Sequence, residues 1–130
     1  MADEPFAISY GALPLEGDAS HGALSWQTLI SGDRTPSSAM VVGVAELPPG
    51  GHLKPHFHPQ AEFYFGLAGS GRVWIAGEVL AIAPNVAVHI PGGREHAIRA
   101  GEEGLRLLYG FAEASFDLVA YTYTGTAPEF

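Results

Sequence analysis

The chain has 130 residues, of which 47% are hydrophobic and 15% charged, and its formal net charge is −8. This length accommodates one domain with a sizeable core, and the composition excludes a disordered chain. Only six residues are Lys or Arg and none is Cys, which argues against nucleic acid as a partner and excludes disulfides and thiolate metal ligands.

Short apolar runs separated by turns predict an all-β chain. The sequence contains 17 glycines and 10 prolines scattered between these runs, and no long helical pattern is visible. No apolar run reaches membrane-spanning length, and residues 1–11 lack the basic start and apolar stretch of a signal peptide. We therefore expect a cytoplasmic protein that has no membrane partner.

The N-terminal part of the chain predicts three strands. A polar arm over residues 1–20 contains an alternating apolar pattern at residues 6–10, which predicts an edge strand. Residues 23–30 also alternate and predict a half-buried strand, whereas the nearly continuous apolar run over 38–47 predicts a strand covered on both faces. His21 stands in a polar turn and is expected at the surface.

Two histidines and a glutamate stand within seven positions in the segment GGHLKPHFHPQAEFYFGLAG. His56 and His58 point the same way if the backbone is extended, because side chains alternate across a strand. By the same alternation, Glu62 and Tyr64 share one face of the strand expected over residues 61–67. A carboxylate that faces inward from a buried strand needs a partner, and a divalent cation is the obvious one.

Residues 69–71, Gly-Ser-Gly, predict a hairpin turn after this strand. The returning strand over residues 72–76 would carry Arg72 and Trp74 on one face. Two further short strands are expected before the Pro-Gly-Gly turn that follows.

That turn, at residues 91–93, precedes a strand over 96–100 whose first residue, His96, is a fourth candidate ligand. The polar sequence GEEG then predicts a hairpin that leads to a strand over 105–111, and residues 116–124 predict a closing strand. About ten short strands at regular spacing predict a β-barrel or jelly roll.

The ligand spacing resembles that of the cupin family. The first cupin motif is matched at every position, by Gly50, His56, His58, Glu62 and Gly69. The second motif is matched at Pro91, Gly93 and His96, with Asn85 in place of the usual glycine and Ala100 in place of the usual asparagine. The resemblance implies a single cupin β-barrel, a double-stranded β-helix or jelly roll, over residues 1–130, with residues 48–124 as the core that carries both motifs.

The resemblance also implies a bound divalent transition metal, held by His56, His58, Glu62 and His96. Three imidazoles and one carboxylate suit Fe, Mn, Ni, Co or Zn, and the sequence does not choose among these metals. Ligand sets of this kind leave coordination positions open, which is more typical of catalytic than of structural sites.

A closer resemblance concerns the segments HFHPQAEFYF and IPGGREHAI and the late aromatic strand. Together these are similar to the small cupin lyases that cleave dimethylsulfoniopropionate to dimethyl sulfide and acrylate. This resemblance implies that Tyr64 is the general base and that the metal binds the carboxylate of a small substrate. Spacing alone leaves open that Tyr64 is a buried tyrosine with a structural hydroxyl.

Four further residues are candidates for substrate binding. Arg72 is a basic residue that could meet a carboxylate, and Trp74, Tyr121 and Tyr123 are aromatic residues that could surround a sulfonium cation. Two other functions remain open at this point: an Fe(II)-dependent cupin dioxygenase, and a non-catalytic cupin that binds a metabolite.

We also expect a homodimer. Phe63 and Phe65 face away from the ligands and need a cover on so small a barrel, which the N-terminal strand of a second copy could provide.

Overall fold

The computed structural model describes residues 3–125 and 129–130. In these residues the regular structure is β, apart from the 3₁₀ turn η1 (Phe116–Leu118), and no helix is long and apolar enough to cross a membrane. The strands of the described chain are β1 (Gly22–Ala23), β2 (Ser25–Ile30), β3 (Val41–Leu47), β4 (His52–Phe57), β5 (Glu62–Ile75), β6 (Glu78–Ile82), β7 (Ala87–Ile90), β8 (His96–Phe111) and β9 (Thr122–Tyr123).

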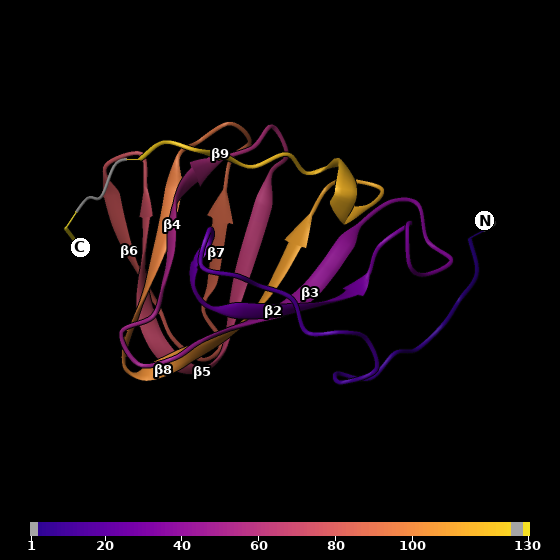
Figure 1. Cartoon of the computed structure of the whole chain (residues 1–130), viewed down its shortest axis with the longest axis horizontal. Helices are drawn as coiled ribbons and strands as arrows, with labels where there is room; N and C mark the ends of the chain where they lie inside the picture. Colours follow the sequence, from indigo (N-terminus) through magenta and orange to yellow (C-terminus); the bar gives the residue numbers. More distant parts are fainter. Residues whose placement is uncertain (1–2, 126–128) are drawn as a thin grey trace.

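Two long strands, β5 and β8, form the frame of the molecule. They pair antiparallel from Glu62 opposite Phe111 to Ile75 opposite His96, and both bend partway along this ladder. The first half of β5 and the second half of β8 belong to one layer, in the order β2-β3-β8-β5-β7. The other halves belong to a second layer, in the order β6-β5-β8-β4, with β1 and β9 pairing with β4. The sheet therefore curls into the two-layered barrel seen in Figure 1.

The hydrophobic core lies between the two layers. Both layers contribute fully buried aliphatic side chains, among them Val41, Val73, Ile90, Ile98 and Leu107. These residues come from four different strands, so the core fixes the two layers against each other.

The hairpins expected at residues 69–71 and 101–104 are wrong, because both segments are bends within continuous strands. Gly69 and Gly104 have φ values of +71° and +78°, which favour glycine, and the ladder shifts register between Gly69 and Gly71. A Cβ on Gly69 would stand 2.1 Å from the carbonyl oxygen of Gly104, so the two backbones approach closely at the bend. The glycines that suggested turns instead allow the paired strands β5 and β8 to bend sharply together, and we call this bend the crease.

A true hairpin joins β5 to β6. Its two central residues, Ala76 and Gly77, both have positive φ, at 46° and 96°, as a tight turn between antiparallel strands requires. Asn85, which replaces the usual cupin glycine, has a φ of 70°, and asparagine tolerates this conformation better than most residues.

The two ends of the chain differ from the expectation. Residues 6–10 do not form a strand, since the arm contacts the barrel only at separate points, such as the bridge between Glu16 and Trp26. In Figure 1 this arm leads away from β2 and β3. The closing strand expected over 116–124 is limited to β9, because the chain first turns through η1.

Candidate metal centre

Three histidines meet at one end of the barrel. His56 lies near the end of β4, His58 follows that strand, and His96 begins β8, where it stands opposite His56 in the ladder. All three side chains are buried, and one ligand atom from each lies within 4.8 Å of the others. Strand register therefore brings together residues that are up to forty positions apart.

Backbone carbonyls orient each of the three rings. The Nδ1 atoms of His56, His58 and His96 lie 2.7, 3.0 and 2.8 Å from the carbonyl oxygens of Lys54, Gln60 and Arg94. Because a carbonyl oxygen only accepts, each Nδ1 donates, and the Nε2 lone pair of a neutral ring then points into the site. Burial, followed by the nearby His96, lowers the pKa of His56 to about 3, so this ring is neutral.

Glu62, the first residue of β5, adds a carboxylate to the three rings. Its Oε1 lies 3.2 Å from Nε2 of both His58 and His96. Burial alone would raise the pKa of the Glu62 carboxyl, but the contacts with these two histidines hold it below its ordinary value. The carboxylate is therefore charged although its side chain is almost fully buried.

The three histidines could hold a divalent cation, and the Glu62 carboxylate lies beside two of them. The Nε2 of His56 is buried and has no hydrogen-bond partner in the described part of the chain, and the other Nε2 atoms face a carboxylate oxygen. Converging lone pairs repel one another unless protons or a cation lie between them. Three imidazole nitrogens and one carboxylate oxygen are ligands that Fe, Mn, Ni, Co and Zn accept in proteins.

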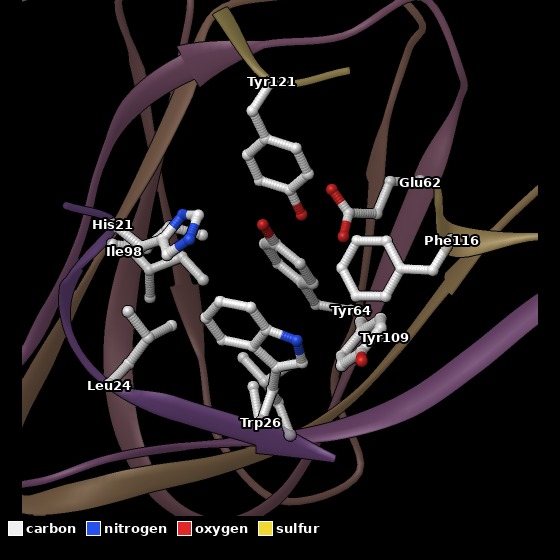
Figure 2. A pocket seen from close by; sticks show the side chains of 12 residues that line it. His21, Leu24, Trp26, Glu62, Tyr64, Ile98, Tyr109, Phe116 and Tyr121 are labelled. Atoms are coloured by element: carbon white, nitrogen blue, oxygen red, sulfur yellow. The ribbon is translucent and has the colours of Figure 1, made fainter. Parts of the chain in front are cut away.

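A small cavity adjoins this cluster. Its volume is ≈ 30 Å³, and Figure 2 shows its labelled side chains converging from both layers and from the C-terminal segment. Glu62 and Tyr64 of β5 contribute polar groups, while the remaining walls are mainly aromatic and aliphatic: His21, Leu24, Trp26, Ala45, Leu53, Ile98, Leu107, Tyr109, Phe116 and Tyr121.

Tyr64 points into this cavity beside Glu62 (Figure 2). The tyrosine is only 2% exposed, and its hydroxyl makes no hydrogen bond within residues 3–125 and 129–130. Burial, followed by the negative charge of Glu62, raises the pKa of Tyr64 well above its ordinary value. The hydroxyl is thus protonated and points into the cavity beside the Glu62 carboxylate.

The aromatic residues predicted near the C-terminus lie close to the cluster. The Tyr121 ring lines the cavity and stacks on His56, with ring centroids 4.7 Å apart and an interplanar angle of 12°. Tyr123 stands opposite His56 in the pairing of β9 with β4 and does not line the cavity.

The structure does not bring Arg72 and Trp74 to the cavity. The buried face of β5 carries Glu62 and Tyr64 before the bend but Val73 and Ile75 after it, because the register shift reverses the alternation. Arg72 is consequently exposed and Trp74 lies beside it on the outer face. Arg72 and Trp74 share one face, as predicted, but it is the face opposite to the one that carries Tyr64 before the bend.

His21 and Phe116 line the cavity although the sequence did not single them out for it. His21 was expected at the surface, but its ring packs edge-on against Trp26, with centroids 4.9 Å apart, and its Nδ1 hydrogen-bonds to the Tyr123 hydroxyl. The contact with Tyr123 joins residues 102 positions apart, so no local pattern could have indicated it.

Comparison with known proteins agrees with this geometry. The model of the cupin domain family matches residues 43–111, which include all four candidate ligands. The chain is also similar to the dimethylsulfoniopropionate lyase DddW of Ruegeria pomeroyi, with 47% identity over 125 residues, which cover 95% of this chain and 82% of that protein.

Solved structures share the fold at lower identity. A variant of oxalate decarboxylase from Bacillus subtilis superposes with a TM-score of 0.78 at 22% identity over 94% of this chain, which spans only 34% of the decarboxylase. The polyketide cyclase RemF from Streptomyces resistomycificus has a TM-score of 0.78 at 19% identity, covering 95% of this chain and 88% of RemF. These likenesses concern the fold alone.

Proposed function

The chain belongs to the cupin domain family, and we propose that it is a metal-dependent lyase that converts dimethylsulfoniopropionate to dimethyl sulfide and acrylate. The observation that carries this proposal is the 47% identity, over 95% of the chain, with the lyase DddW. The three-histidine cluster beside a mainly aromatic cavity supports it, because the cluster offers a metal site and the cavity a place for a small substrate.

The reaction is a β-elimination. A base removes a proton from the carbon next to the carboxylate, and the electron pair of that C–H bond forms the double bond of acrylate. The C–S bond breaks at the same time or afterwards, and its electron pair leaves with the neutral sulfide. The abstracted proton is very weakly acidic, so the site must stabilise the charge that develops on the carboxylate side.

We assign the metal to His56, His58, Glu62 and His96. A bound divalent cation would supply Lewis-acid stabilisation of the substrate carboxylate. The backbone carbonyls of Lys54, Gln60 and Arg94 keep the three Nε2 lone pairs directed into the site, which reduces the reorganisation needed when the metal binds.

We assign the role of general base to Tyr64. Its hydroxyl is buried, lines the cavity and has no hydrogen-bond partner in the described residues, so it is free to meet the substrate. Burial and Glu62 keep the hydroxyl protonated in the protein alone, whereas a nearby cation favours the phenolate form.

The aromatic walls suit the sulfonium end of the substrate. Trp26, Tyr109 and Phe116 contribute ring faces or edges to the cavity, and aromatic faces attract organic cations. Tyr121, stacked on His56, is placed to contact substrate at the metal end. We do not assign this role to Arg72 and Trp74, since both lie on the outer face of β5.

One assay tests the proposal. The purified protein is reconstituted with each of Fe, Mn, Ni, Co and Zn, and dimethylsulfoniopropionate is added under air and under nitrogen. Equal release of acrylate and dimethyl sulfide in both atmospheres, with at least one metal, is the expected result. Oxygen consumption without acrylate would indicate a dioxygenase, and binding without conversion would indicate a metabolite-binding cupin.

We further propose that the protein is a homodimer. An apolar groove of ≈ 370 Å³ on the layer that contains β3 and β8 is lined by Met40, Phe63 and Ala112 among other residues, and the first two side chains are 50% and 39% exposed. Exposed apolar surface of this kind commonly marks an interface. A solution mass equal to that of one chain, by light scattering, would contradict a dimer. The cytoplasmic location stays a prediction.

A further inference from the structure

The cavity is too small for the proposed substrate as it stands. Its volume of ≈ 30 Å³ holds about one or two water molecules, whereas pockets for small molecules typically measure about 300–1,000 Å³. A substrate of that size therefore requires part of the wall to move.

The C-terminal strap, defined as residues 112–125, is that part. It crosses the end of the barrel where the histidines meet, as the yellow segment between η1 and β9 in Figure 1. It supplies Phe116 and Tyr121 to the cavity wall. Its strand pairing is limited to two residue pairs with β4, and elements with so few ladder bonds open at low free-energy cost. Single hydrogen bonds also attach its first half, from Gly32 N to Ala114 O and from Phe116 N to Ser31 Oγ, and its end, from Thr124 N to Pro55 O.

A second contact holds the strap from the opposite side. His21, next to β1, hydrogen-bonds through Nδ1 to the Tyr123 hydroxyl. The His21 ring also lies near the rings of Tyr121 and Tyr123, at centroid distances of 6.2 and 5.7 Å, and packs edge-on against Trp26. One side chain thus joins the strap to the wall formed by β1 and β2.

We propose that the strap is a gate to the cavity and that the hydrogen bond between His21 and Tyr123 holds this gate closed. His21 is a positioning residue, because it holds Tyr123 and thereby keeps Tyr121 over His56. The proposed movement of the strap is argued from its few attachments and the small cavity, while the identity of the molecule that enters rests on the function proposed above.

Cleavage by chymotrypsin measures the opening directly. Phe116 and Tyr121 are cleavage sites within the strap, and mass spectrometry separates their products from those of cuts elsewhere. We expect His21→Phe, which keeps an aromatic ring, and Tyr123→Phe, which removes one oxygen, each to speed strap cleavage about 2- to 10-fold, as the loss of one hydrogen bond predicts. The double variant should match the single variants, because both changes break the same bond.

Tyr10→Phe is the matched control. Tyr10 is 37% exposed on the N-terminal arm, far from the strap in sequence, and its loss of a hydroxyl should leave strap cleavage unchanged. His21→Gln, which keeps a hydrogen-bonding group, should restore part of the protection. Wild-type cleavage rates in both Phe variants, or fully additive effects in the double variant, would show that the His21–Tyr123 hydrogen bond does not hold the strap closed.

Kinetics with dimethylsulfoniopropionate distinguish this proposal from the proposed function. With an active wild type, both Phe variants should raise KM about 2- to 10-fold and change kcat less than about twofold, at unchanged metal content. Faster cleavage with unchanged KM would overturn the role as a gate. An inactive wild type would overturn the lyase assignment. The cleavage experiment would still decide whether the His21–Tyr123 hydrogen bond holds the strap closed.

Discussion

His56 and His96 stand opposite each other in the pairing of β4 with β8, and their ring centroids lie 4.2 Å apart. The candidate metal centre is therefore a product of strand register: one ligand from each of two neighbouring strands, completed by His58 and by Glu62 at the start of β5. A shift of one residue in this ladder would turn one of the two rings to the outer face.

Loss of one ligand should abolish tight metal binding. We expect His96→Ala to weaken binding of the preferred metal at least about 100-fold, since removal of partners of metal ligands alone costs about 10- to 100-fold. Titration calorimetry and metal analysis measure this. His89→Ala, at an exposed position on β7, is the control and should bind like the wild type. Equal affinity in the two variants would remove His96 from the site.

Replacement of Tyr64 by Phe tests the base. We expect kcat for acrylate release to fall about 10²- to 10⁴-fold, the usual contribution of a general base, while metal content stays unchanged. The shape of the cavity wall is kept, because only one oxygen is removed. A variant that retains more than about a tenth of the wild-type kcat would show that another group takes the proton.

Alkaline pH should destabilise the protein. Burial raises the pKa of Tyr64, Tyr109 and Tyr121 above the ordinary value of 10.0, and that of Tyr123 to about 12. Between pH 10 and these values the unfolded chain loses protons that the folded chain keeps, so the free energy of unfolding falls as pH rises. The fall is at most about 1.4 kcal/mol per pH unit for each tyrosine.

Urea denaturation of the metal-free protein from pH 8 to pH 11 measures this slope. Tyr109→Phe should make the decline above pH 10 shallower, because one titrating phenol is removed. A free energy of unfolding that stays constant up to pH 11 would contradict the prediction.

Gly66 should tolerate no side chain. A Cβ at this position would stand 2.0 Å from the carbonyl oxygen of Ala83, a backbone atom that cannot turn away. We expect Gly66→Ala to lower the free energy of unfolding by more than about 2 kcal/mol. Gly101→Ala, whose nearest contact is the mobile Oγ of Ser70 at 3.1 Å, should cost less than about 1 kcal/mol. Thermal denaturation compares the two variants.

Local pattern was sufficient where the relevant contacts are local. His56, His58, Glu62 and Tyr64 follow from alternation along short extended segments, and the structure places their side chains together. Alternation did not predict the placement of Arg72 and Trp74, because register shifts in the ladder after Gly66 reverse which side chains of β5 face the core. In the sequence, the glycines at these shifts cannot be distinguished from those of a turn.

Contacts between distant parts of the chain were not predictable. The hydrogen bond from His21 to Tyr123 spans 102 positions, and a histidine between serine and glycine resembles an exposed turn. The paired glycines Gly69 and Gly104 illustrate the same limit, since each alone indicates a hairpin and only their close approach reveals a crease.

Both ends of β8 reach the ligands, His96 at its start and Phe111 at its finish, where the Phe111 ring packs edge-on against His58 with centroids 5.1 Å apart. The exposed residues Glu102 and Glu103 lie at the crease between them. Extra residues inserted there would extend into solvent from the bend while both halves of the strand keep their neighbours. Insertions elsewhere in β8 would shift one half and its ligand contacts. Grafting a short Gly-Ser peptide at each place and comparing metal affinity would reveal this difference in tolerance. The crease is thus the position in β8 at which the barrel should accept added sequence.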